Sequence, residues 1–284
     1  MKTTHFKQIG LLSMLVFFFS QAYTQPQNEL LLPYLLHDSL ATKTTVNNNV
    51  ATIIPLQSNV RKYVDQYLDK NAEILEHIKK RNGATLKTIE QILVKRGIPA
   101  GLMYLAIVES ELKNSATSGV GAAGIWQLMP ETARTLGLQV NGRTDQRRHT
   151  YKSSVAAADY LKALYKQFDD WLLVVAAYNC GAGNVYKAIK LSGSREFWKL
   201  QRFLPGETRN HVKHFIATHF YYQENGSVVT LTKKERIHYL ASLDEMVVKE
   251  DETKPGNSPA SGIQPCNVVL PVQQEGELMC DLRR

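Results

Sequence analysis

The sequence predicts a mainly helical fold. Between residues 60 and 220, apolar residues recur at intervals of three and four, and the apolar/polar alternation of strands is scarce. Proline and glycine stand where such helices should begin and end. With 284 residues, of which 44% are hydrophobic and 21% charged, the chain suits one domain of ordinary size with flanking segments.

The N-terminal segment has the features of an export signal. Two lysines precede an apolar run from Ile9 to Phe19 that is short for a membrane span, and small residues lead up to Ala22. We expect a signal peptide at residues 1–22, with an uncleaved anchor as the alternative, and no stable membrane insertion after cleavage. Residues 23–55 are polar and irregular, which indicates a linker or stem.

Residues 56–225 are expected to form the helical domain. Its first two apolar patterns run over residues 60–78 and 86–93, and Gly97 ends the second. Pro99 then opens IPAGLMYLAIVESELK as a first-turn proline. A short helix should begin at Glu131.

Three further helices complete the expected domain. They are SSVAAADYLKALYKQF, capped by Ser153 or Ser154, then WLLVVAAYN, closed by Gly181, and a last one from Glu207 to Phe220. Beyond it the composition shifts to charge, proline, glycine and serine. Residues 226–284 are therefore expected to be a largely irregular C-terminal extension.

The net charge and the cysteines limit which partners and which compartment the protein can have. The net charge of +8 suits an anionic polymer such as a cell wall, and export makes nucleic acid the weakest candidate. Cys266 and Cys280 could close a loop of about 14 residues in an oxidising compartment. Cys180 is interpreted as a packing residue. The histidines of one predicted helix lack a convincing third ligand, so no metal is expected there: His211, His214 and His219.

The stretch from residue 106 to residue 130, AIVESELKNSATSGVGAAGIWQLMP, contains the dinucleotide-binding pattern G-x-G-x-x-G. That pattern needs a strand before its first glycine and a helix that begins at its last. Neither is expected around GVGAAG. The glycines are therefore interpreted as residues of tight turns.

Glu109 is the stronger signal in the same stretch. It shares the expected apolar stripe of its helix with Leu102, Leu105 and Leu112. Desolvation disfavours the charged form of a carboxylate, which suits such a group to donate a proton. The alternative is an ion pair at the rim of the stripe.

Four motifs in order resemble the lytic transglycosylases of glycoside hydrolase family 23. They are ES at residues 109–110, SGVGAAGIWQLMP from Ser118, AAYNCGAG from Ala176 and PGETRNHV from Pro205. The resemblance covers roughly residues 55–225 and implies a lysozyme-like, soluble lytic transglycosylase-type helical domain. It also implies cleavage of the MurNAc-GlcNAc β-1,4 bond of peptidoglycan without water and without a cofactor, leaving 1,6-anhydro-MurNAc ends.

The resemblance also implies the roles of single residues. Glu109 would be the one catalytic acid and base, and Tyr178 would hydrogen-bond to it. The residues expected to bind substrate are Ser118, Gln127, Tyr178, Asn179 and Glu207. Three of these have structural alternatives: Tyr178 as a core aromatic, Asn179 as a helix cap and Glu207 as a first-turn acid. Trp126 departs from the residues common in the family and would alter sugar stacking.

Two other functions stay open at this point. A hydrolase of the goose-lysozyme type would need a second carboxylate to position water, and Asp145 or Asp159 are the candidates. A non-catalytic wall-binding protein would need no acid. In each case we expect an exported monomer of the periplasm or cell envelope whose partner is the peptidoglycan glycan strand.

Overall fold

The described part of the chain is built from helices and connecting loops. The computed structural model describes residues 54–252, with side chains up to residue 243. Within these residues every regular element is an α-helix or a 3-10 helix, and only isolated bridges pair extended residues. The prediction of a mainly helical fold is confirmed. The predicted signal peptide, nearly all of the predicted linker, and Cys266 and Cys280 lie outside the described residues.

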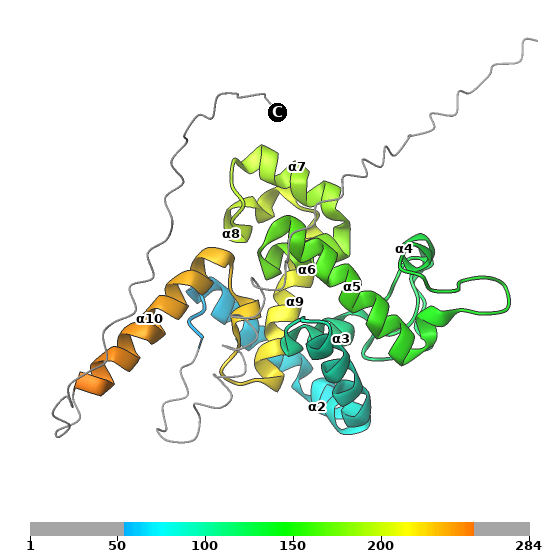
Figure 1. Cartoon of the computed structure of the whole chain (residues 1–284), viewed down its shortest axis with the longest axis horizontal. Coiled ribbons are helices and arrows are strands. Elements are labelled where there is room, and N and C mark those ends of the chain that lie inside the picture. The colour runs from blue at the N-terminus through cyan, green and yellow to red at the C-terminus, as the bar shows by residue number, and fades with distance from the viewer. Residues whose placement is uncertain (1–53, 253–284) are drawn as a thin grey trace, which may run out of the picture. The chain divides into compact units, whose positions relative to one another are not determined.

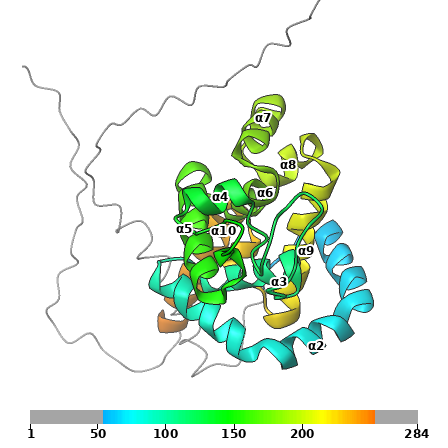
Figure 2. The same ribbon diagram turned by 90° about the vertical axis from the view of Figure 1, so that its right-hand side faces the viewer.

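Helix α2, Ser58–Lys95, carries both of the first two predicted apolar patterns. Asn82 interrupts it with a φ of −116° and a ψ of 19°, and its side-chain amide donates to the Ile78 carbonyl at 3.1 Å. Figure 2 shows the two halves of α2 lying at an angle to each other. The kink lets both halves bury their apolar stripe against one core: Val60, Val64, Leu75 and Ile78 before it, and Leu86, Ile89, Ile92 and Leu93 after it.

Helices α6, Trp171–Cys180, and α9, Gly206–Tyr222, pack against each other in the core and lie close together in Figure 1. Residues 171–177 of α6 are all buried, and Gly181 ends this helix as predicted. α9 confirms the last predicted helix. The remaining elements are η2 (Ala100–Met103), α3 (Tyr104–Ser110), α4 (Pro130–Thr135), η3 (Gln146–Arg148), α5 (Thr150–Phe168), α7 (Ala182–Ser192), α8 (Phe197–Leu200), η4 (Gln201–Phe203), η5 (Val228–Thr230) and α10 (Lys233–Glu252).

The predicted cap of α5 was wrong. This helix begins at Thr150, after His149, whose ring nitrogen accepts from the Lys152 amide at 3.4 Å. Ser153 and Ser154 lie buried inside the helix and donate to carbonyls four residues earlier, at 2.9 and 2.7 Å. A serine hydroxyl can be satisfied in this way within a helix, so its presence near a helix start does not by itself mark the cap.

Helical structure continues past residue 225, in the stretch expected to be largely irregular. Val229 and Leu231 are buried, and the Thr232 amide donates to the Glu235 carboxylate at 2.9 Å at the start of α10. That bond satisfies a free N–H group of a helix N-terminus. None of the helices within residues 54–252 has both the length and the hydropathy needed to cross a bilayer.

Candidate active site

Glu109 lies in the last turn of α3, and its side chain is 13% exposed. Its predicted helical neighbours Leu102 and Leu105 are fully buried, so the acid does sit at the edge of the apolar stripe. Leu112 was expected on the same helix, but the backbone leaves the helix at Glu111, with φ of 54° and 61° at these two residues. Leu112 therefore reaches the core from a left-handed turn.

His211 of α9 faces this acid. Its Nε2 lies 3.3 Å from Oε1 of Glu109, and its side chain is 10% exposed. Within the described residues Nε2 has no partner that meets hydrogen-bond geometry, so this contact is close in distance but misaligned in angle. Glu109 and His211 thus form a largely buried pair of groups that can each hold or give up a proton.

Residues 116–128, called the glycine turn below, follow α3 and carry GVGAAG. Gly124 has a φ of 79°, and a Cβ there would stand 2.0 Å from the Arg147 carbonyl oxygen. Gly121 has a φ of 89° but nothing within 4 Å of the Cβ position. The glycines serve backbone geometry, as predicted, and Gly124 is the one that a neighbouring backbone requires.

The buried Arg147 holds the glycine turn from beneath. Its Nη1 donates to the carbonyls of Gly121 and Leu128 at 2.7 and 2.9 Å, and its Nε and Nη2 donate to Asp145 at 2.8 and 2.9 Å. These guanidinium hydrogen bonds lower the pKa of Asp145. A planar donor fork of this kind fixes several acceptors at once.

Ser118 and Gln127 both belong to the glycine turn. The Ser118 hydroxyl accepts from the Ala122 amide at 3.0 Å, and the Gln127 amide donates to the Gly124 carbonyl at 2.8 Å. Ser110, next to the acid, donates to the Ile125 carbonyl at 2.9 Å and joins α3 to the turn. The two predicted sugar-binding residues are therefore attached to the segment that carries Glu109.

Tyr178 joins α6 to the same turn. Its hydroxyl donates to the Trp126 carbonyl at 2.7 Å. The hydroxyl proton is therefore not donated to Glu109, although the resemblance implied that it would be. Burial raises the pKa of Tyr178 well above its usual value, and the Glu109 charge adds to the rise. Trp126 itself is fully buried and donates from Nε1 to Ser154 at 2.9 Å. Its predicted effect on sugar stacking was wrong, because the indole packs inside the domain.

Asn179 and Glu207 occupy different environments. The Asn179 Oδ1 accepts from the Thr208 hydroxyl at 2.7 Å, which ties the end of α6 to the start of α9. Glu207 is exposed in the first turn of α9, where the helix dipole favours an acid. It precedes His211 by four residues and so shares a face of α9 with it.

The histidines of α9 have separate neighbours. His214 packs its ring 5.0 Å from that of Tyr67, and His219 contacts the Ser227 hydroxyl at 2.9 Å. Burial lowers the pKa of His219 to about 3. Among the described residues no three side chains of the ligating types gather where they could hold a metal ion.

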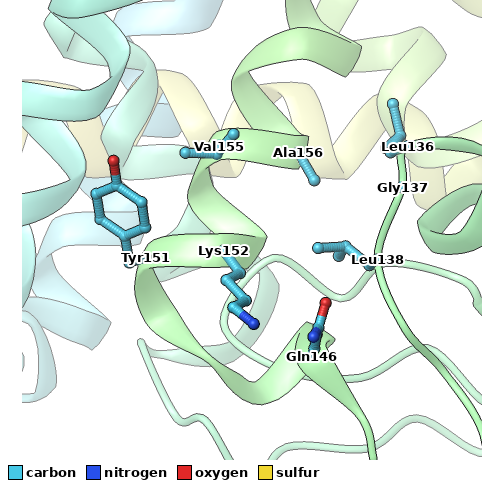
Figure 3. Close-up of a pocket in the computed structure, with 8 residues that line it drawn as sticks. All are labelled: Leu136, Gly137, Leu138, Gln146, Tyr151, Lys152, Val155 and Ala156. Carbon is cyan, nitrogen blue, oxygen red and sulfur yellow. The ribbon is translucent and has the colours of Figure 1, made fainter.

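A separate hollow of about 300 Å³ lies between the loop after α4 and the first turns of α5. Figure 3 shows its lining, which is mainly aliphatic, with the polar side chains of Gln146 and Lys152 and the aromatic Tyr151. It contains no carboxylate and none of the predicted site residues. The hollow is therefore separate from the candidate site around Glu109.

Residues 88–201 match the family described as Transglycosylase SLT domain. The matched segment includes Glu109, the glycine turn and Tyr178, and it ends before α9. The resemblance to lytic transglycosylases that the four motifs indicated is confirmed.

Three proteins named as lytic transglycosylases are similar to this chain. Membrane-bound lytic murein transglycosylase D of Escherichia coli strain K12 is 41% identical over 169 residues, which are 58% of this chain and 37% of that protein. The chain thus spans little more than a third of the length of this relative. A lytic transglycosylase Slt from Pseudomonas aeruginosa, solved as an inactive mutant, is 26% identical, with a TM-score of 0.44 over 51% of this chain and 26% of that one. The 70 kDa soluble lytic transglycosylase of Escherichia coli is 21% identical, with a TM-score of 0.47 over 72% and 36%.

Two residues in contact with the candidate site were not predicted as such from the sequence. His211 was weighed only as a metal ligand, and Ser110 only as part of the ES motif. The spacing between Glu109 and His211 is not periodic, so no pattern pairs them. Motif membership was the available signal, since both residues lie within the motifs that carry the resemblance.

Proposed function

We propose that this protein is a peptidoglycan lytic transglycosylase that cleaves the MurNAc-GlcNAc β-1,4 bond without water. The observation that carries the proposal is Glu109, a largely buried carboxyl at the end of α3 within the SLT domain. The Escherichia coli relative is named a lytic murein transglycosylase, which supports the same substrate class.

The proposed reaction needs one carboxyl. Protonated Glu109 donates its proton to the oxygen between the two sugars, and the bond from that oxygen to C1 of MurNAc breaks. The muramoyl 6-hydroxyl oxygen then bonds to C1, and its proton passes to the Glu109 carboxylate. The acid is restored and a 1,6-anhydro end is left. A positioned acid and base typically contributes about a hundredfold to ten-thousandfold in rate.

The surroundings of the other candidate carboxylates support a transglycosylase over a hydrolase. Both oxygens of Asp145 accept from Arg147, and both oxygens of Asp159 accept from Arg96, at 2.6 and 2.8 Å. A carboxylate held by a guanidinium fork has little capacity left to orient a water. Glu109 is the candidate that no arginine engages.

The remaining site residues have supporting roles in this proposal. Ser118, Gln127 and Glu207 offer hydroxyl, amide and carboxylate groups to the sugars, which present hydroxyl and acetamido groups. Tyr178 shapes the site through its bond to the Trp126 carbonyl, and Asn179 holds α9 beside the acid while its amide group contacts substrate.

Mass spectrometry of the fragments released from peptidoglycan by the full chain tests the proposal. Anhydro disaccharide-peptides are expected from the wild type, and none from Glu109→Gln. Asp159→Asn is the matched control, since its carboxylate only pairs with Arg96, and it should keep the anhydro products. Fragments heavier by one water would show a hydrolase, and binding without fragments would show a wall-binding protein.

We also propose the setting and organisation of the chain. A signal peptide at residues 1–22 directs export to the periplasm or envelope, residues 23–55 form a stem, the catalytic domain begins near residue 56, and a C-terminal extension follows it. The protein acts as a monomer on glycan strands. Edman sequencing of the protein purified from its host should give an N-terminus near Tyr23, and a start at Met1 would contradict export by cleavage.

A further inference from the structure

The contact between His211 and Glu109 poses a physical question. The two side chains are 10% and 13% exposed, and within the described residues Nε2 of His211 lacks a partner with hydrogen-bond geometry. A buried donor or acceptor without a partner destabilises the fold. An imidazole would therefore be a poor choice here if its role were packing alone.

The groups around the pair single out Glu109 as the partner. On α9, Glu207 lies four residues before His211 and is exposed. His214 lies three residues after it, its pKa is lowered by burial and then by His211, and its ring packs on Tyr67 of α2. On α6, Tyr178 lies near Glu109, but its proton is committed to the Trp126 carbonyl. Within the described residues, only α3 places an acidic group, Glu109, within ion-pair distance of Nε2 of His211.

We propose that His211 is a positioning residue for Glu109, an inference that rests on the proposed transglycosylase function. Nε2 carries a proton and donates it to Oε1, which fixes the rotation of the carboxyl. Oε2 is then the oxygen that gives its proton to the glycan. The 3.3 Å misaligned contact fits an unliganded site, since catalytic hydrogen bonds are often long there and tighten when substrate binds.

The same contact acts after the first proton transfer. Once Oε2 has given its proton to the bridging oxygen, Glu109 is an anion, and the Nε2–H bond to Oε1 becomes charge-assisted. Oε2 then takes the proton from the muramoyl 6-hydroxyl, and the pair returns to its starting state. His211 exchanges no proton with the sugar, so the cycle needs no further reactant.

The test compares two variants of the full chain with the wild type on soluble glycan strands. His211→Leu removes the donor and should lower kcat about tenfold or more, with KM little changed. His211→Gln presents an amide N–H at a similar reach and should keep kcat within about threefold. In His211→Leu, the fall of kcat on the alkaline side of its pH profile should occur at higher pH than in the wild type, because the ionised Glu109 carboxylate loses a donor that stabilises it. Thermal unfolding checks that both variants fold.

Several results separate this inference from the proposed function. A folded Leu variant with the wild-type kcat and pH profile would overturn it, as would equal losses in Leu and Gln. If Leu does not fold, His211→Asn replaces it, since its shorter amide cannot reach Oε1, and a wild-type kcat there would also overturn the inference. A wild type that releases no anhydro product would fail both proposals, whereas wild-type activity with unaffected His211 variants would fail only this one.

Discussion

The glycine turn and the acid end of α3 lie next to each other in the chain, and they are held in opposite ways. Arg147 donates two short hydrogen bonds to carbonyls of the turn and two more to Asp145, and Ser110 and Tyr178 each donate to one further carbonyl of the turn. Glu109 has one misaligned contact, at 3.3 Å. The glycine turn, which is expected to bind sugar, is thus fixed before substrate arrives, while the Glu109 carboxyl remains able to hold and give up a proton.

This difference has a physical reason. Backbone carbonyls in a turn lack the regular partners of a helix, so other N–H or O–H groups must satisfy them if the turn is to be rigid, as the side chains of Arg147, Ser110 and Tyr178 do here. A reacting acid must instead keep an oxygen open to the substrate, and every donor that engages it stabilises its ionised form. The following predictions break one side of this comparison at a time.

Glu109→Gln should give the largest effect. The amide keeps nearly the same shape but cannot donate an acidic proton, so release of anhydro fragments should fall by about a hundredfold to ten-thousandfold. Thermal unfolding should stay close to wild type, because Glu109 makes little structural contact. A variant that keeps more than a tenth of wild-type release would contradict the assignment of the acid.

Gly124→Ala should disrupt the glycine turn without changing Glu109. Its Cβ would stand 2.0 Å from the Arg147 carbonyl at a φ of 79°, so we expect a loss of about 3 kcal/mol or more in the free energy of unfolding. Gly121→Ala is the matched control: its φ is 89° but the space is open, and it should lose only about 1–2 kcal/mol. Equal losses of unfolding free energy in the two variants, measured by urea unfolding, would contradict the requirement for glycine at position 124.

Tyr178→Phe distinguishes the two regions most finely. The change leaves the Trp126 carbonyl without its donor, which should cost about 1–2 kcal/mol of unfolding free energy. Because the hydroxyl proton does not reach Glu109 in this structure, kcat should fall less than about tenfold. A loss as large as that of Glu109→Gln, in a folded variant, would show that Tyr178 acts directly on the acid.

The smallest effect is expected from the pH dependence of the ion pair between Arg147 and Asp145. Arg147 lowers the folded pKa of Asp145 from 3.8, so ionised Asp145 stabilises the fold above about pH 4, and this is lost as pH falls through the folded pKa. The contribution should stay below about 1 kcal/mol, since the pair is partly exposed. The free energy of urea unfolding between about pH 2 and about pH 5 should therefore depend less on pH in Asp145→Asn than in the wild type, and identical slopes would contradict the role of the carboxylate.

The regular helices could be predicted because their signal is local. The stripes of α2 and the apolar run of α6 with Gly181 beyond it follow from spacing and from glycine at a helix end. The motifs located Glu109 and the glycine turn on residue types alone. α7 and α8 gave no such signal, because they bury few apolar residues.

Contacts between distant segments could not be predicted. The burial of Trp126 depends on Ser154 of α5, and the neighbour of Glu109 depends on the packing of α9 against α3. Leu112 shows the same limit locally, since the left-handed residues that end α3 have no glycine to mark them. Periodicity describes one helix at a time, whereas these features require the relative placement of two.

Digestion of peptidoglycan in ¹⁸O-labelled water tests the central claim most directly. If the muramoyl 6-hydroxyl oxygen bonds to C1 while Glu109 takes its proton, the new MurNAc ends contain no solvent oxygen, and their masses match those formed in ordinary water. Fragments that carry the label at those ends would show that water attacks C1, and would contradict the transglycosylase mechanism proposed for this protein.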